Sequence, residues 1–256
     1  MVKELDKIFF LNLDSRKLRW NSLKPHIDHP SLQRFPAVNS IEDPFIYKNY
    51  DLTLNPVGIA HTLYFSSHYG AVGCYLSHYL MWKEIIKNKW ESVLILEDDI
   101  ELVSLQLFLQ KFRKNDYKSY NLVQLSCKSG FGGTEAYWLD YKAAQTLVET
   151  THNPSLLNKI VPASGATNQI INKGLIKKDT YTWEVKNSIT SPSDKFLRYV
   201  VKADLIKFKR RKKISLDIGL CNNSSILGDS GFRVHELDKE KLEKYSNLKN
   251  FKWWET

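Results

Sequence analysis

The stretch "SVLILEDDI", residues 92–100, decides the fold class. Its four apolar residues (93–96) run directly into three adjacent acids, Glu97, Asp98 and Asp99. A continuous apolar run of this length is typical of a strand that is covered on both faces. Three carboxylates in a row repel one another unless a cation or a ligand lies among them. The stretch therefore predicts a buried strand with a binding site at its carboxyl end.

Predicted strands and helices alternate through the first 150 residues. The strands are expected at 7–13, 32–38, 92–96 and 120–126, and the helices at 73–89 and 141–150. Beyond residue 150, a short helix is expected near 167–173. In the helix 73–89, Tyr75, Tyr79, Trp82 and Ile86 fall on one face, which we expect to pack in the core. This alternation is typical of an α/β sandwich around a largely parallel sheet.

The composition indicates a globular protein and a class of partner, but it does not identify the function. The chain has 256 residues, 43% hydrophobic and 25% charged, which suffices for one sizeable core. Its net charge of +9 favours a polyanionic partner such as nucleic acid, anionic lipid or a phosphorylated substrate. The 3 cysteines are too few and too scattered for a disulfide framework or a structural zinc site, and they suit a reducing compartment.

The N-terminal segment and a basic run at residues 207–213 indicate where in the cell the protein is expected. The opening "MVKELDKIFFLNLD" lacks the features of a signal peptide, and no segment approaches the roughly 20 apolar residues of a membrane span. We expect a cytoplasmic protein that is either freely soluble or peripheral at a membrane surface. The run "KFKRRKK" (207–213) would contact anionic lipid. A nucleic-acid reading rests on that run alone, because no zinc finger, helix-turn-helix or aromatic RNA-binding motif accompanies it.

The acids after residue 96 stand where ligands bind in open α/β sheets, beyond the carboxyl ends of the strands. Hard cations such as Mn²⁺ and Mg²⁺ choose carboxylate oxygens. Side chains alternate along a strand, so Glu97 and Asp99 should point one way and Asp98 the other. One carboxylate can then hold a metal while its neighbour holds a hydroxyl. The alternative is a solvated turn whose acids meet nearby lysines.

The segment 73–102, "GCYLSHYLMWKEIIKNKWESVLILEDDIEL", resembles the central signature of glycosyltransferase family 25, which includes lipooligosaccharide and collagen hydroxylysine galactosyltransferases. The matching residues are Gly73, Cys74, Ser77, His78, Trp82, Glu97, Asp98 and Asp99. Flanking segments also resemble the family, through Asn12, Asp14, Arg16 and Arg19 in "FFLNLDSRKLRW", through "RFPAVNS" with Ser40 where glycine is usual, and through "TEAYWLDYKAAQTLV" with Ala143 in place of glycine. The likeness covers roughly residues 7 to 170.

The resemblance implies an A-type nucleotide-sugar glycosyltransferase fold, a Rossmann-like mixed sheet flanked by helices. It implies a UDP-galactose or UDP-glucose donor, Mn²⁺ (or Mg²⁺), transfer to a hydroxyl of a glycan or of hydroxylysine, and inversion at the anomeric carbon. Asp99 would coordinate the metal, and Asp98 would meet the ribose or help to hold the metal. The donor-binding residues would be Asn12, Asp14, Arg16, Glu97 and Asp98.

The second half of the chain is less informative. We expect one domain over 1–256, with a nucleotide-sugar-binding half at 1–150 and an acceptor-side half with a basic C-terminal extension at 151–256. Asp229 and His235 are weak candidates for a third metal ligand, each of which could equally lie in a surface turn.

The family usually carries a Pro-x-Asp motif whose acid is a candidate base, and here the nearest stretch has Asn168, an amide that cannot take a proton as a carboxylate does. Either Asp179, Glu184 or Asp194 substitutes, or the chain is a catalytically silent relative that binds a sugar nucleotide or acts as an interaction module. Of the signature helix residues, His78 is expected to be buried under the sheet rather than at substrate, and Cys74 to be a small core residue.

Overall fold

The structure is a computed structural model that describes residues 5–27, 29–40, 42–43, 45–54, 70–98, 109, 119–125, 134–153, 156, 188–189 and 193–210. A six-stranded sheet in the order β2-β1-β4-β6-β5-β8 forms its centre. The strands are β1 (Lys7–Asn12), β2 (Leu32–Pro36), β4 (Val93–Glu97), β5 (Leu122–Gln124), β6 (Ala136–Leu139) and β8 (Phe208–Arg210). Two short strands, β3 (Thr53–Leu54) and β7 (Ser188–Ile189), pair separately in parallel.

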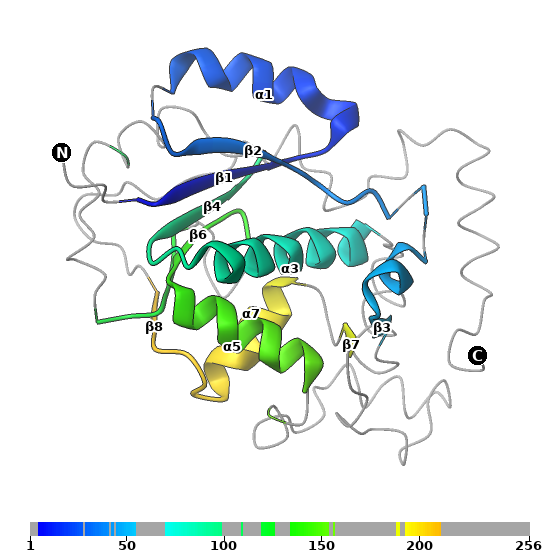
Figure 1. The fold of residues 1–256 in the computed structure, drawn as a ribbon, viewed down its shortest axis with the longest axis vertical. Helices are drawn as coiled ribbons and strands as arrows, with labels where there is room; N and C mark the ends of the chain where they lie inside the picture. Colours follow the sequence, from blue (N-terminus) through cyan, green and yellow to red (C-terminus); the bar gives the residue numbers. More distant parts are fainter. Residues whose placement is uncertain are drawn as a thin grey trace.

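Helices cover both faces of the sheet (Figure 1). They are α1 (Lys17–Leu23), α3 (Gly70–Asn88), α5 (Tyr141–His152) and α7 (Ser193–Lys202), with 3₁₀ turns η1 (Asp14–Arg16), η2 (Lys24–His26) and η3 (Ile46–Tyr50). In Figure 1, α1 lies on one side of the sheet, and α3, α5 and α7 lie on the other. The strands and helices predicted in the first 150 residues are thus confirmed, with ends that differ by a few residues.

The sheet is mixed, so the expectation of a largely parallel sheet needs correction. β1 pairs in parallel with β2 and β4, and β5 pairs in parallel with β8. β6 runs antiparallel to both of its neighbours, β4 and β5. Only residues 125–135 connect β5 to β6. A parallel crossover needs about a dozen residues or more, usually with a helix, so a connection this short favours the antiparallel pairing.

The apolar run in β4 is buried on both faces, as its sequence predicts. Val93 and Ile95 belong to the cluster that packs under α3, α5 and α7. Leu94 and Leu96 belong to the opposite cluster, against which Trp20 of α1 packs. Side chains of one strand alternate between faces, so one unbroken apolar run supplies both cores.

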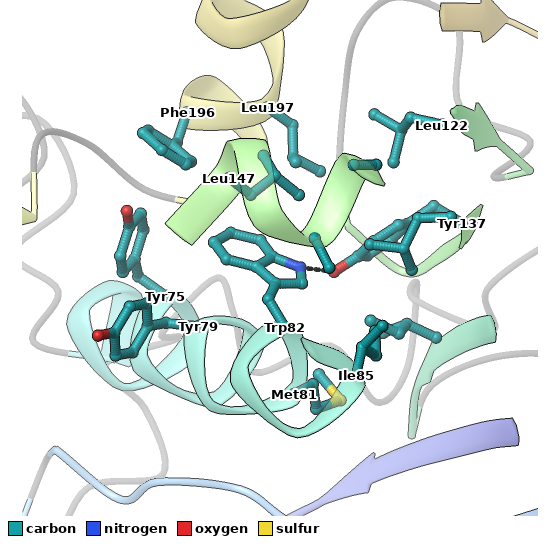
Figure 2. Packing of buried hydrophobic residues seen from close by; sticks show 14 of the residues in the cluster. Tyr75, Tyr79, Met81, Trp82, Ile85, Leu122, Tyr137, Leu147, Phe196 and Leu197 are labelled. Atoms are coloured by element: carbon teal, nitrogen blue, oxygen red, sulfur yellow. Dashed lines mark hydrogen bonds between the residues drawn. The ribbon is translucent and has the colours of Figure 1, made fainter. Parts of the chain in front are cut away.

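The aromatic face of α3 forms the centre of the larger core (Figure 2). Tyr75, Tyr79 and Trp82 are almost fully buried, which confirms the predicted stripe, while Ile86 is only partly buried at its edge. The Trp82 ring stacks on Phe196 of α7, with the ring centroids 5.9 Å apart. This packing fixes α3 against the sheet and thereby sets the position of the residues that precede Trp82 on the same helix.

Asp140 begins α5 as its N-cap. Its Oδ1 accepts a hydrogen bond from the Ala143 amide at 2.7 Å, and its Oδ2 accepts one from Asn121 Nδ2 at 2.7 Å. A capping carboxylate satisfies an amide that would otherwise lack an intrahelical partner. The cap lies between β6 and α5 and ties both to the segment that enters β5.

Several expectations concern the chain's second half. The predicted short helix near 167–173 lies outside the described residues. In the basic run 207–213, residues 208–210 form the edge strand β8 beside β5, so that part of the run belongs to the sheet. Among the helices that the structure describes, none has both the length and the apolar character needed to cross a membrane.

Candidate active site

The candidate site forms where β1 and β4 end side by side. Their parallel register places Leu11 opposite Glu97, so the next residues, Asn12 and Asp98, meet at the same sheet edge. Asn12 Nδ2 donates to Asp98 Oδ2 at 2.8 Å. The structure therefore places Asn12 and Asp98 together at the strand end where the sequence predicts a site, and ligand binding there stays a prediction.

Asn12 links three strands through its side-chain amide, which is almost completely buried. Besides Asp98, its Nδ2 donates to the Arg16 carbonyl at 3.0 Å. Its Oδ1 accepts from Arg34 Nε of β2 at 2.9 Å. Because both amide protons and the oxygen are engaged, the orientation of this side chain is fixed by its partners.

The carboxylates of Glu97 and Asp98 point to opposite faces, as the alternation of side chains predicts. Asp98 faces α1, where its Oδ1 accepts from Arg19 Nη1 at 2.9 Å. Glu97 faces α3, where its Oε1 contacts His78 Nε2 at 3.1 Å and accepts from Thr134 Oγ1 at 2.5 Å. Each carboxylate thus has its own donors, which offsets the repulsion between adjacent acids.

Asp14 lies at the rim of the site, two-thirds exposed. Its Oδ1 accepts from Arg34 Nη2 at 2.6 Å and lies 3.5 Å from Lys17 Nζ. The hydrogen bond from Arg34 lowers the pKa of the Asp14 carboxyl below its usual value. Arg16 contributes its backbone carbonyl, through the bond from Asn12. The structure therefore brings Asn12, Asp14, Arg16 and Asp98 together, while Glu97 lies at the same strand end with its side chain on the opposite face.

Three residues of the site escaped the sequence prediction. Arg19 and Arg34 pair with the predicted acids, and Thr134 bonds to Glu97. Arg19 and Arg34 could have been found from the sequence. Both stand in segments that resemble the family, and Arg34 interrupts a short strand that is otherwise mostly apolar. Thr134 had no such signal, because its contact depends on how β6 approaches β4.

The remaining predicted site residues lie outside the described part of the chain. They are Asp99, predicted to bind the metal, Asn168, at the position of the expected base, and the weak ligand candidates Asp229 and His235. Asp179 and Glu184 also lie there, and Asp194 lies in α7, with no description of its side chain. The roles given to these residues stay predictions.

A second polar group stands behind the strand end. Ligand-type atoms of Cys74, His78 and Glu97 all lie within 4.8 Å of one another. His78 is fully buried, as expected, yet it contacts Glu97 and so adjoins the site. Cys74 is only half-buried, and its Sγ lies 3.9 Å from Glu97 Oε1. The expectation that Cys74 is a small core residue therefore needs correction, because its thiol contacts the site acid.

This architecture, a mixed parallel and antiparallel sheet flanked by helices with polar residues at the carboxyl edge, is that of an A-type (GT-A-like) α/β glycosyltransferase. The family model described as glycosyltransferase family 25 (LPS biosynthesis protein) matches residues 5–122. The matched residues hold β1, α3 and β4, so the part of the chain that carries the site is similar to glycosyltransferase family 25. The resemblance drawn from the sequence is confirmed.

Individual relatives agree. A glycosyltransferase 25 family member of Drosophila pseudoobscura pseudoobscura is 27% identical over 263 residues, which cover 93% of this chain and 38% of the relative. One of Aedes aegypti is 31% identical over 102 residues, covering 36% of this chain and 16% of the relative. Human procollagen galactosyltransferase 2 is 52% identical over 31 residues, covering 12% of this chain and 5% of that protein. The chain thus spans well under half the length of these relatives.

Proposed function

We propose that this chain transfers a hexose, galactose or glucose, from a UDP-sugar to a hydroxyl group of a glycan or of hydroxylysine. The observation that carries the proposal is the meeting of Asn12 and Asp98 at the ends of two neighbouring parallel strands, 2.8 Å apart. In open α/β sheets this edge is where nucleotides bind. The family match and the name of the human relative support the galactosyl class of reaction.

The charges at this edge suit a nucleoside diphosphate. The guanidinium groups of Arg19 and Arg34 lie beside the acids and are both largely buried. Guanidinium groups recognise phosphate oxygens well, and the acids keep them oriented. Asn12 and Arg34 join the ends of β1 and β2, so the edge is held in place before a ligand arrives.

A hard cation fits the donor atoms of this edge, which are carboxylate oxygens. Both oxygens of Asp98 already accept hydrogen bonds from Asn12 and Arg19, so Asp98 is better suited to hold the edge together than to hold a metal. Asp99 would therefore be the principal ligand of Mn²⁺ or Mg²⁺, with Asp229 or His235 as further candidates. The bound cation would offset negative charge on the departing UDP.

The test is UDP release by the purified protein from a panel of UDP-sugars, with Mn²⁺ and with a chelator. We expect turnover of one donor, which disappears with the chelator and in Asp99→Asn. Glu91→Gln is the matched control, because this exposed acid lies at the opposite, amino end of β4. Loss of turnover in the control as well as in Asp99→Asn, or turnover that survives chelation, would contradict the assignment.

The alternative is a catalytically silent relative that binds the sugar nucleotide, and the observation that favours it is Asn168 in place of the expected acid. The same assay separates the two. A silent relative binds UDP in a Mn²⁺-dependent manner but turns over no donor. Restoring the acid with Asn168→Asp would then be expected to yield turnover, since a carboxylate can accept the acceptor's proton.

The basic run 207–213 supports a further part of the proposal, contact with an anionic membrane surface where a lipid-linked acceptor would lie. Sedimentation with phosphatidylserine vesicles checks it. Binding should weaken as salt is raised and on replacing residues 211–213 by glutamine. Stronger binding to nucleic acid than to the vesicles would favour the nucleic-acid reading instead.

A further inference from the structure

A chain of buried hydrogen bonds runs from α3 to the site acid Glu97. Trp82 Nε1 donates to the Tyr137 hydroxyl at 3.0 Å, which Figure 2 shows as a dashed line. The Tyr137 hydroxyl lies 2.7 Å from His78 Nδ1. His78 Nε2 lies 3.1 Å from Glu97 Oε1. The first three side chains are almost fully buried, so their polar atoms depend on one another for partners.

The positions of the protons follow from the chemistry of each group. An indole N–H can only donate, so the Tyr137 oxygen accepts from Trp82. Burial raises the pKa of Tyr137 far above its usual value, so its hydroxyl keeps its proton and donates it to His78 Nδ1. Nδ1 is then an acceptor, and the imidazole carries its proton on Nε2, which donates to Glu97.

We propose that His78 is a positioning residue: held in the Nε2–H tautomer by Tyr137, it fixes Glu97 at the carboxyl end of β4. The inference deepens the proposed function, in which Glu97 is a donor-binding residue, and it rests on that function. Thr134 Oγ1 and the Cys74 thiol add two further donors to the same Glu97 oxygen, at 2.5 and 3.9 Å. With the Glu97 side chain fixed on the α3 face of the sheet, the next residue, Asp98, is oriented to accept hydrogen bonds from Asn12 and Arg19 on the α1 face.

The competing interpretation is a metal ion held by Cys74, His78 and Glu97. Thiolate and imidazole suit Zn²⁺ better than the Mn²⁺ of the proposed reaction. A metal on Nε2 moves the imidazole proton to Nδ1, which must then donate to the Tyr137 oxygen. That oxygen would accept from both Trp82 and His78, and the Tyr137 proton would lose its acceptor in a buried place, which costs about 1–3 kcal/mol. In the metal-free hydrogen-bond chain, by contrast, the Trp82, Tyr137 and His78 protons each have an acceptor.

The tautomer of His78 therefore distinguishes the two interpretations, and long-range ¹H–¹⁵N NMR of ¹⁵N-histidine protein reads it directly. The chain has 7 histidines, so the His78 signals are assigned by their absence in His78→Gln. We expect a protonated Nε2 and an unprotonated Nδ1, unchanged by Zn²⁺ or chelator, and a loss of this single tautomer in Tyr137→Phe. A protonated Nδ1, or signals that move when Zn²⁺ is added, would overturn the proposal.

The positioning role is checked by calorimetric measurement of UDP affinity in the presence of Mn²⁺. We expect His78→Leu to weaken UDP binding at least tenfold, because a hydrogen bond to a charged acid is lost, and His78→Gln to recover most of it, because its amide still offers an N–H to Glu97. Equal affinity in His78→Leu and wild type would refute the role. Should His78→Leu not fold, Tyr137→Phe takes its place in the same comparison. Wild type that binds no UDP refutes the proposed function, whereas the tautomer is read without any ligand.

Discussion

Replacing Gly73 by alanine should destabilise the fold, because α3 packs there directly against the chain that follows β2. A Cβ at position 73 would lie 2.5 Å from the Val38 carbonyl oxygen and 2.5 Å from Ser40 Oγ. The approach is held by two hydrogen bonds, from the Val38 amide to Ser77 Oγ at 2.8 Å and from Ser77 Oγ to the Gly73 carbonyl at 2.6 Å. The segment therefore cannot move aside without breaking contacts.

The size of the effect follows from two opposed terms. Both overlaps fall 0.5 Å below the 3.0 Å that Cβ contacts essentially never cross (3.0 − 2.5 = 0.5), and one partner is backbone that cannot rotate away. Overpacking of this kind costs about 1–3 kcal/mol, and two overlaps place Gly73→Ala at the upper end. Alanine returns about 1 kcal/mol through its higher helix propensity. The net loss is about 2 kcal/mol in the free energy of unfolding, or about 4–8 °C in Tm for a chain of this size.

Urea unfolding followed by tryptophan fluorescence measures this loss as a lower midpoint with an unchanged slope. The matched control is Ser40→Gly, which removes one of the two overlaps. In the double variant the losses should be less than additive by about 1 kcal/mol, because the two side chains meet directly. A Gly73→Ala protein as stable as the wild type, or strictly additive losses, would refute the reasoning about this contact.

The further predictions concern two carboxyl groups with shifted pKa values, those of Asp14 and Asp140. Arg34→Gln should raise the pKa of Asp14 toward 3.8, because Arg34 lowers it in the wild type; carboxyl NMR titration checks this, and an unmoved pKa would mean that the pair does not form in solution. Because that pKa is lowered on folding, the Asp14–Arg34 interaction stabilises the fold above pH 3.8 and is lost as the pH falls through the lowered value. For Asp140 the sign is opposite, since burial raises its pKa above 3.8. Relative to Asp140→Asn, the wild type should therefore lose stability as the pH rises from 3.8 through the raised pKa of Asp140. A difference between the urea midpoints of the two proteins that stays constant over this pH range would contradict the prediction. Asp140→Ala should cost about 1 kcal/mol through loss of the helix cap, and a change well below that would show that the cap is dispensable.

The local sequence determined the central strand β4, the helix α3 packed on it and the position of the acids that follow the strand. The unbroken apolar run 93–96 can only be satisfied by burial on both faces, and the aromatic period of residues 75–82 only by a helix against the core. The acids that follow the run then stand at a strand end, where alternation sends Glu97 and Asp98 to opposite faces. These properties depend on neighbouring residues alone, so sequence suffices for them.

Partners across the fold were decided by tertiary structure alone. The antiparallel direction of β6 brings Tyr137 beside His78 and Thr134 beside Glu97, although 59 and 37 residues separate these pairs. Likewise, Arg34 reaches Asn12 because β2 pairs with β1 in one particular register. Such contacts depend on strand order, direction and register, which are set by the packing of the whole core. No local pattern encodes which donor will meet which acid, and that is why the hydrogen-bond chain behind Glu97 became visible only in the folded protein.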